Sequence, residues 1–208
     1  MSVVSVKIDI CNLALSKLGN YGSVEDIDTP QKPTEKIFRK WYDVAREKAL
    51  KELMPNFALS RRLIAQDTTA TPPFGYDYAY KKPEDCLKVL GIGEIETKKN
   101  LYSVEGRSIV TNEDYTDDGL PIRFIKDITD TTKFSAEFVS ALALYLAKQT
   151  CMEITQDEVK YKQLYAELLT EKANVAALSG QENRPIRINR SKFAQSRSTA
   201  HPTNYDKE

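Results

Sequence analysis

The segment FSAEFVSALALYLAKQTCMEI, residues 134–154, decides the class of fold that we expect. Read as a helix, it carries apolar residues on almost every side, whereas a surface helix carries one apolar stripe. Its most apolar part, residues 138–147, is about half as long as a helix that crosses a bilayer. The segment therefore predicts the buried central helix of a soluble helical bundle.

Further helices are expected on both sides of this segment. Their ranges are 8–18, about 34–54, 56–65 (a short helix) and about 155–178. Thr34 is predicted to cap the second helix, and Thr155 with Glu158 fits a capping box that opens the last one. The face of the second helix that turns inward is predicted to hold Ile37, Trp41, Val44, Ala45, Lys48 and Leu53. The corresponding face of the last helix is predicted to hold Val159, Tyr161, Leu164, Leu168, Val175 and Ala176.

Between the helical halves the apolar residues alternate, as they do in strands with one buried face. We expect a small β-rich insertion over about 66–127. Strands are predicted in LKVLGIGEI (87–95) and PIRFIKDI (121–128), and a hairpin is predicted to join LYSV (101–104) to RSIVT (107–111). The predicted fold class is therefore mainly α, a bundle of about four helices with a small β-rich insertion and an extended C-terminal arm.

The stretch FGYDYAYKKPEDCLKVL, residues 74–90, allows two interpretations. Phe74, Tyr76, Tyr78 and Tyr80 alternate with small or polar residues, which is typical of a strand with one buried face. Aromatic residues beside lysines can also stack on the bases of a nucleic acid. The chain has 30 basic and 30 acidic residues, so its overall charge gives no reason to bind DNA. The residues by themselves leave both interpretations open.

The C-terminal arm is defined by its charge. Residues 1–180 are expected to form the body, and residues 181–208 a flexible arm with few apolar residues. Between Arg184 and Arg197 the arm has five basic residues and no acidic one. Apolar residues stand between the charges, as in a segment that orders on a partner, but a solvated, unpacked end explains the pattern equally well.

The residue types needed for familiar catalytic centres are scarce. The single histidine, His201, lies in the arm, whereas a Ser-His-Asp or Cys-His centre needs a histidine in the packed body. The pair Glu84–Asp85 and the acidic Glu137 both have ordinary structural explanations, at a turn and in the first turn of a helix. The cysteines Cys11, Cys86 and Cys151 show no zinc spacing and no disulfide framework. We therefore expect no enzymatic activity, no metal and no cofactor.

Four segments in order resemble one protein family. They are ICNLALSKLGNYGSVEDID (10–28), PNFALSRRLIA (55–65), the tyrosine-rich stretch at 74–90, and residues 134–176. Together they resemble the head-to-tail adaptors of short-tailed bacteriophages, also called tail tubular protein A or head completion proteins. Asn56 stands where that family usually has tryptophan, and Lys82 where it usually has leucine.

The resemblance implies a structural protein of the virion, placed at the head–tail junction and present in the host cytoplasm before assembly. Such adaptors form a dodecameric ring beneath the portal protein, extend the DNA channel and carry the downstream tail protein. DNA passes through without sequence-specific binding, and no membrane is involved. The tyrosine-rich stretch is then a scaffold segment that leads into a strand. We expect a monomer before the portal is met.

The family's C-terminal segment reaches the portal, and by position it corresponds to residues 181–208. The residues hypothesised to bind the portal are Arg184, Ile186, Arg187, Ile188, Arg190, Lys192, Phe193 and Arg197. Two other functions stay open. The chain is alternatively a nucleic-acid-binding module that uses its basic arm, or a tail-associated peptidoglycan hydrolase, although no carboxylate pair stands out as catalytic.

Overall fold

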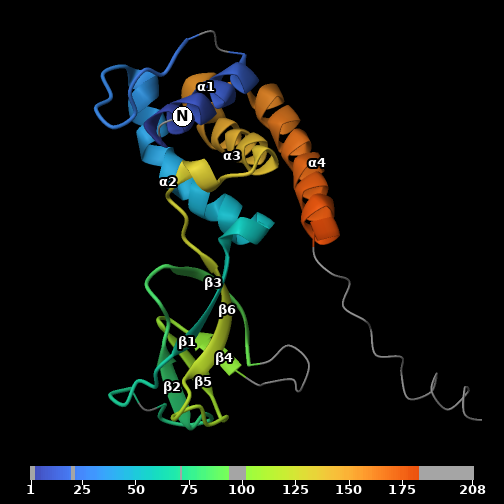
Figure 1. Cartoon of the computed structure of the whole chain (residues 1–208). Helices are drawn as coiled ribbons and strands as arrows, with labels where there is room; N and C mark the ends of the chain where they lie inside the picture. The colour runs from blue at the N-terminus through green and yellow to red at the C-terminus, as the bar shows by residue number, and fades with distance from the viewer. Residues whose placement is uncertain (1–2, 20–21, 71, 94–101, 183–208) are drawn as a thin grey trace, which may run out of the picture.

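The computed structural model describes residues 3–19, 22–70, 72–93 and 102–182. The chain folds into a helical module and a β module that lie end to end (Figure 1). The helices are α1 (Val3–Leu18), α2 (Pro33–Leu53), α3 (Ala136–Ile154) and α4 (Glu158–Glu182). Among the described residues, six strands lie between α2 and α3 in the sequence. The fold is therefore mixed α/β, not mainly α as the sequence predicted, because the insertion forms a second module with its own core.

Helix α3 is the centre of the helical module, as its apolar surface predicted. It contacts α1, α2 and α4. Phe138, Leu142 and Leu146 are fully buried along it. Aromatic side chains pack at the start of the helix, where the ring of Phe138 meets the rings of Phe57 and Phe134 edge-on, with centroid distances of 5.1 and 4.9 Å. A helix covered by neighbours on three sides has to be apolar on all of them, which explains the pattern in the sequence.

The buried face of α2 agrees with the predicted one only in part: Ala45 and Leu53 are buried as predicted, but the rest of the face is displaced. Phe38, Tyr42, Ala45 and Ala49 are buried at the spacing of one helical face, whereas Val44 is 51% exposed. Trp41 lies at the edge of this face, where its indole N–H donates to Glu153 at 2.8 Å. On α4 the predicted residues Leu164, Leu168 and Val175 are buried, but Val159 and Ala176 are exposed.

Two predicted caps are also wrong. Helix α2 begins at Pro33, so Thr34 lies inside its first turn. Thr155 ends α3, and its hydroxyl donates to the carbonyl of Cys151 at 2.8 Å. The first turn of α4 is capped by Asp157, whose carboxylate accepts from the backbone N–H groups of Val159 (2.8 Å) and Lys160 (3.0 Å). Asp is as good a cap as Thr, and the sequence did not distinguish the two positions.

The β module consists of two antiparallel sheets of three strands each. One sheet has the order β1 (Leu59–Ile64), β6 (Leu120–Lys126), β3 (Cys86–Ile92). The other has the order β2 (Tyr78–Lys81), β5 (Ser108–Thr111), β4 (Tyr102–Glu105). Tyr80, Ile109, Leu120 and Phe124 are fully buried between the two sheets. The predicted hairpin is confirmed as β4–β5, with Gly106 at φ +60° in its turn.

The predicted short helix at 56–65 is wrong. Residues Asn56–Ala58 form a single 3-10 turn, and β1 follows at once. The sequence ALSRRL suits a helix locally, but pairing along the whole of β6 decides for a strand. Within the tyrosine-rich stretch, only Tyr78–Lys81 form the strand β2, and the stretch ends inside β3. Tyr80 is fully buried, as the strand interpretation predicted, whereas Phe74, before β2, is 86% exposed.

A polar contact connects the two modules. Arg46 of α2 is almost fully buried and pairs with Asp127, just after β6. The same guanidinium donates to the carbonyl of Ile128 at 3.0 Å. The backbone N–H of Asp127 donates to the carbonyl of Asp85 at 2.7 Å, which ties the start of β3 to the same point.

Candidate interaction surfaces

The eight residues predicted to bind the portal all lie outside the described residues. They are Arg184, Ile186, Arg187, Ile188, Arg190, Lys192, Phe193 and Arg197. Helix α4 continues to Glu182, a little beyond the predicted boundary of the body at residue 180. The portal-binding hypothesis therefore stays a prediction from the sequence.

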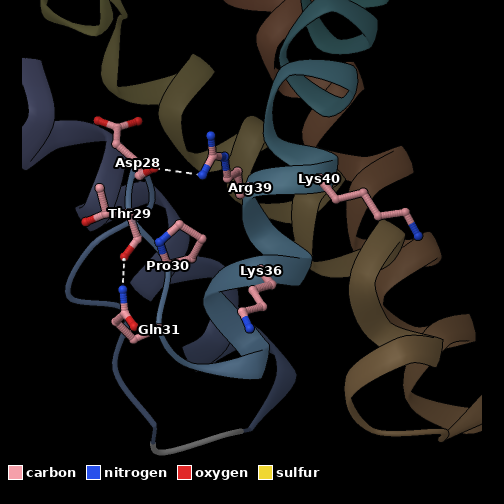
Figure 2. Close-up of a pocket in the computed structure, with 7 residues that line it drawn as sticks. All are labelled: Asp28, Thr29, Pro30, Gln31, Lys36, Arg39 and Lys40. Atoms are coloured by element: carbon pink, nitrogen blue, oxygen red, sulfur yellow. Dashed lines mark hydrogen bonds between the residues drawn. The ribbon is translucent and has the colours of Figure 1, made fainter.

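A shallow recess lies between α2 and the loop that precedes it (Figure 2). Its volume is about 690 Å³, and it is lined by Asp28, Thr29, Pro30, Gln31, Lys36, Arg39 and Lys40. We call it the basic recess, since three of these seven side chains are cationic and one is acidic. The loop is held in place by Asp26, whose carboxylate accepts from the backbone N–H groups of Asp28 (2.7 Å) and Thr29 (3.1 Å).

Two of the three cations of the basic recess are already engaged. Arg39 donates to the carbonyl of Asp28 at 2.8 Å. Lys40 points away from the loop in Figure 2, pairs with Glu153 at 3.2 Å and lies 4.7 Å above the ring of Trp41. Lys36 has no carboxylate within salt-bridge distance among the described residues. The recess therefore offers one uncommitted cation, enough for a surface contact with an acidic group.

A second recess lies between the start of α3 and the last turns of α4. It has a volume of about 440 Å³ and is lined by Glu137, Glu171, Asn174, Val175, Ala177 and Leu178. Its two charged groups are both acidic, the reverse of the basic recess. Asn174 donates to Glu171 at 3.5 Å, and Leu178 is half exposed at the rim. Glu137, considered above as an acid in the first turn of a helix, occupies that position in α3.

The shifted pKa values in the body have structural causes. Backbone hydrogen bonds from Lys32 and Glu25 lower the pKa of Glu35 to about 2. Burial raises the pKa of the Cys11 thiol to about 12. Burial, together with the hydrogen bond to Glu52, also raises the pKa of Tyr145. Among the described residues, no group of three or more His, Cys, Asp or Glu side chains is placed to hold a metal ion.

None of the helices in the described ranges is both long and apolar enough to cross a membrane. No protein-family model matches the chain, and no curated protein is significantly similar to it in sequence. The function is therefore inferred from the sequence segments and from the surfaces described above.

Sequence reasoning missed the basic recess. The signal was present, because Lys36, Arg39 and Lys40 recur at the spacing of one helical face shortly after a loop that contains Pro30. Only the folded loop places the Asp28 carbonyl opposite Arg39, so neither the cavity nor the engagement of that cation was predictable.

Proposed function

We propose that this protein is a head-to-tail adaptor of a short-tailed bacteriophage, a structural component of the virion. It assembles as a ring beneath the portal protein, extends the DNA channel and provides the attachment platform for the downstream tail protein. The observation that carries the proposal is the ordered resemblance of the four segments at 10–28, 55–65, 74–90 and 134–176.

The structure shows what individual residues of these segments do in the fold. The side chain of Asn12 donates to the carbonyl of Val24 at 3.2 Å and accepts from its N–H at 2.8 Å, so it fastens the loop after α1 to the helix. The carbonyl of Pro83 accepts from the N–H of Cys86 at 3.0 Å, and this turn leads into β3. These are framework roles, which supports reading the segments as parts of a scaffold.

The end-to-end arrangement of two modules also suits an assembly protein (Figure 1). A closed ring is built from heterologous contacts, in which different surfaces of one chain meet in neighbouring copies. An elongated chain with separate modules can give one end to the portal and the other to the downstream tail protein. The basic arm at 181–208 is the part assigned to the portal, where ordering on a partner adds contact area at an entropic cost.

The deciding experiment is electron microscopy of the purified protein, alone and mixed with portal rings from the same virus. We expect monomers alone and a rotationally symmetric layer beneath the portal in the mixture. If correctly folded portal rings gain no layer, the adaptor function is wrong. Binding to duplex DNA should then be measured against salt, because a nucleic-acid-binding module loses affinity steeply as salt rises.

A truncation tests the role of the arm. A chain that ends at Glu182 keeps every element of the body, so its circular dichroism and melting temperature should match those of the full chain. It should no longer bind portal rings. A matched control replaces the five arginines and lysines between 184 and 197 by glutamine and keeps the length of the arm. Normal portal binding by the truncated chain would remove the arm from the portal contact.

A further inference from the structure

The sheet β1-β6-β3 has an outer face that turns away from the core of the β module. Because side chains alternate along a strand, Ile64, Ile122 and Phe124 enter the core and their neighbours face outward. The end of this outer face next to the helical module is covered, since Ile125 is buried in the core of that module. The remainder, which we call the basic face, consists of Leu59, Arg61, Leu63, Lys88, Pro121 and Arg123.

Two arginines stand directly opposite each other on the basic face. Arg61 of β1 pairs in register with Arg123 of β6, and Arg123 pairs with Gly91 of β3. Like charges directly across two strands destabilise a sheet. No carboxylate of the described residues lies within salt-bridge distance of either side chain. Arg62, on the inner face, differs from both. Its side chain pairs with Asp85 at 3.0 Å and lies 5.6 Å from the centre of the Phe124 ring.

The basic face also carries exposed apolar residues. Leu63 is 63% exposed and Leu59 is 37% exposed, on the same strand as Arg61 and on the same side. A phosphate backbone would meet the arginines but gain nothing from these leucines. Arginines flanked by uncovered leucines fit an acidic protein segment better, since interface centres combine arginine with apolar residues.

An acidic loop of the same module supplies such a segment. It runs from Glu113 to Gly119, between β5 and β6, and Asp117 and Asp118 are exposed. No cation of the described residues lies within salt-bridge distance of these two carboxylates. The hydroxyl of Tyr80 accepts from the backbone N–H of Tyr115 at 3.0 Å, which fixes the loop from inside the core.

We propose that the basic face binds the acidic loop of a second copy of this chain. The two surfaces are different parts of one module, so the contact is heterologous and can repeat from copy to copy around a ring. The contact deepens the proposed adaptor function and supplies its lateral interface. Because charged groups form it and salt screens them, it is weak in dilute solution at physiological salt, in keeping with a monomer before the portal is met.

The test uses self-association of the full chain without any portal, by sedimentation equilibrium at millimolar protein and low salt. We expect concentration-dependent association that disappears at high salt. R61E/R123E, in which both arginines of the face become acidic, should associate at least about tenfold more weakly, because like charges then meet across the contact. D117K/D118K, in which the loop becomes basic, should show the same loss.

The mixture of the two variants is the decisive sample. The acidic face of one variant then meets the basic loop of the other, and the two unchanged surfaces also meet, so an equimolar mixture should regain the association of the wild type. This recovery cannot come from misfolded chains. The proposal is overturned if the wild type stays monomeric under these conditions, or if mixing restores nothing. Loss of duplex-DNA binding in R61E/R123E, without recovery on mixing, would assign the face to nucleic acid.

The self-association experiment and the portal-ring experiment can fail independently of each other. A layer beneath the portal with no association of free chains would retain the adaptor and reject this interface. Association that follows the charge rules with no layer on portal rings would retain the interface and reject the adaptor.

Discussion

At Glu35 one carboxylate organises the loop before α2. It accepts from the backbone N–H groups of Gln31 and Lys32, both at 2.9 Å, and of Glu25 at 3.1 Å. The side chain is buried by this loop. Hydrogen bonds to the ionised form, foremost those from Lys32 and Glu25, lower its pKa from 4.5 to about 2.

This lowered pKa predicts a pH dependence of folding. A depressed pKa means that the ionised carboxylate stabilises the fold at pH values above 4.5, and that this stability is lost as the pH falls toward 2. Urea unfolding of the wild type at a series of pH values should show a falling midpoint in this range. Glu35→Gln should start lower at pH 7 and change less over the same range. Equal slopes for the two proteins would show that Glu35 is not the group responsible.

Arg46 carries the polar contact between the modules. The change Arg46→Ala leaves the carboxylate of Asp127 and the carbonyl of Ile128 without their partner in a largely buried position. Breaking a buried pair in this way should cost about 3 kcal/mol of the free energy of unfolding, measured by urea denaturation. The matched control is Arg61→Ala, which removes an exposed arginine and should cost less than about 0.5 kcal/mol. A similar small cost for both would mean that the contact at the junction is not stabilising.

At the scale of elements, the position just before β6 accepts only glycine without strain. Gly119 has φ +79°, and a β-carbon built there would lie 3.2 Å from the backbone oxygen of Ile64. Its N–H donates to the carbonyl of Tyr115 at 2.9 Å, which closes the acidic loop. A left-handed backbone and a nearby backbone atom both oppose any side chain at this position.

We therefore expect Gly119→Ala to destabilise the protein by about 1–2 kcal/mol, measured by thermal or urea unfolding. Gly180→Ala is the matched control, because Gly180 lies in α4 with nothing within 4 Å of the built β-carbon. In a helix, alanine is better than glycine by up to about 1 kcal/mol, so this variant should be neutral or slightly more stable. Equal effects of the two substitutions would contradict the explanation from backbone conformation.

The sequence predicted elements best where their burial is uniform. Apolar residues on almost every side of residues 134–154 led to α3, and alternation in 101–111 led to the β4–β5 hairpin. The prediction from sequence failed at Leu59–Ile64. This segment is compatible with a helix, and only its pairing with β6 makes it a strand. The prediction also failed for part of the buried face of α2. An apolar stripe through Ile37 and Val44 competes with one through Phe38 and Tyr42, and only the neighbouring helices decide which is buried.

At the scale of the whole molecule, the two modules have cores of unequal size. Counted over the part of the chain that the structure describes, the helical core has 28 buried residues and the β core has eight. The two modules also meet at their connections, because Ala58, just before β1, and Ile125, near the end of β6, are buried in the helical core. A smaller core supports less stability, so the β module should open more readily than α3.

Hydrogen exchange of backbone amides tests this difference. In the wild type we expect the amides of β1, β3 and β6 to exchange faster than those of α3. Phe124→Ala removes a fully buried ring from the β core and should cost about 3–5 kcal/mol there. Protection should fall in the three strands and remain unchanged in α3. If α3 loses protection to the same extent, the two modules unfold as one cooperative unit.

The sequence by itself determined the central helix, the presence of a β-rich insertion and the main strands within it, because the pattern of apolar residues is a local property of the chain. It also carried the four segments on which the adaptor proposal rests. Only the tertiary structure decided that the insertion is a module of two sheets, that Arg61 lies opposite Arg123, and that Arg46 reaches Asp127. These facts depend on strand pairing and on contacts between residues far apart in the chain, which no local pattern specifies.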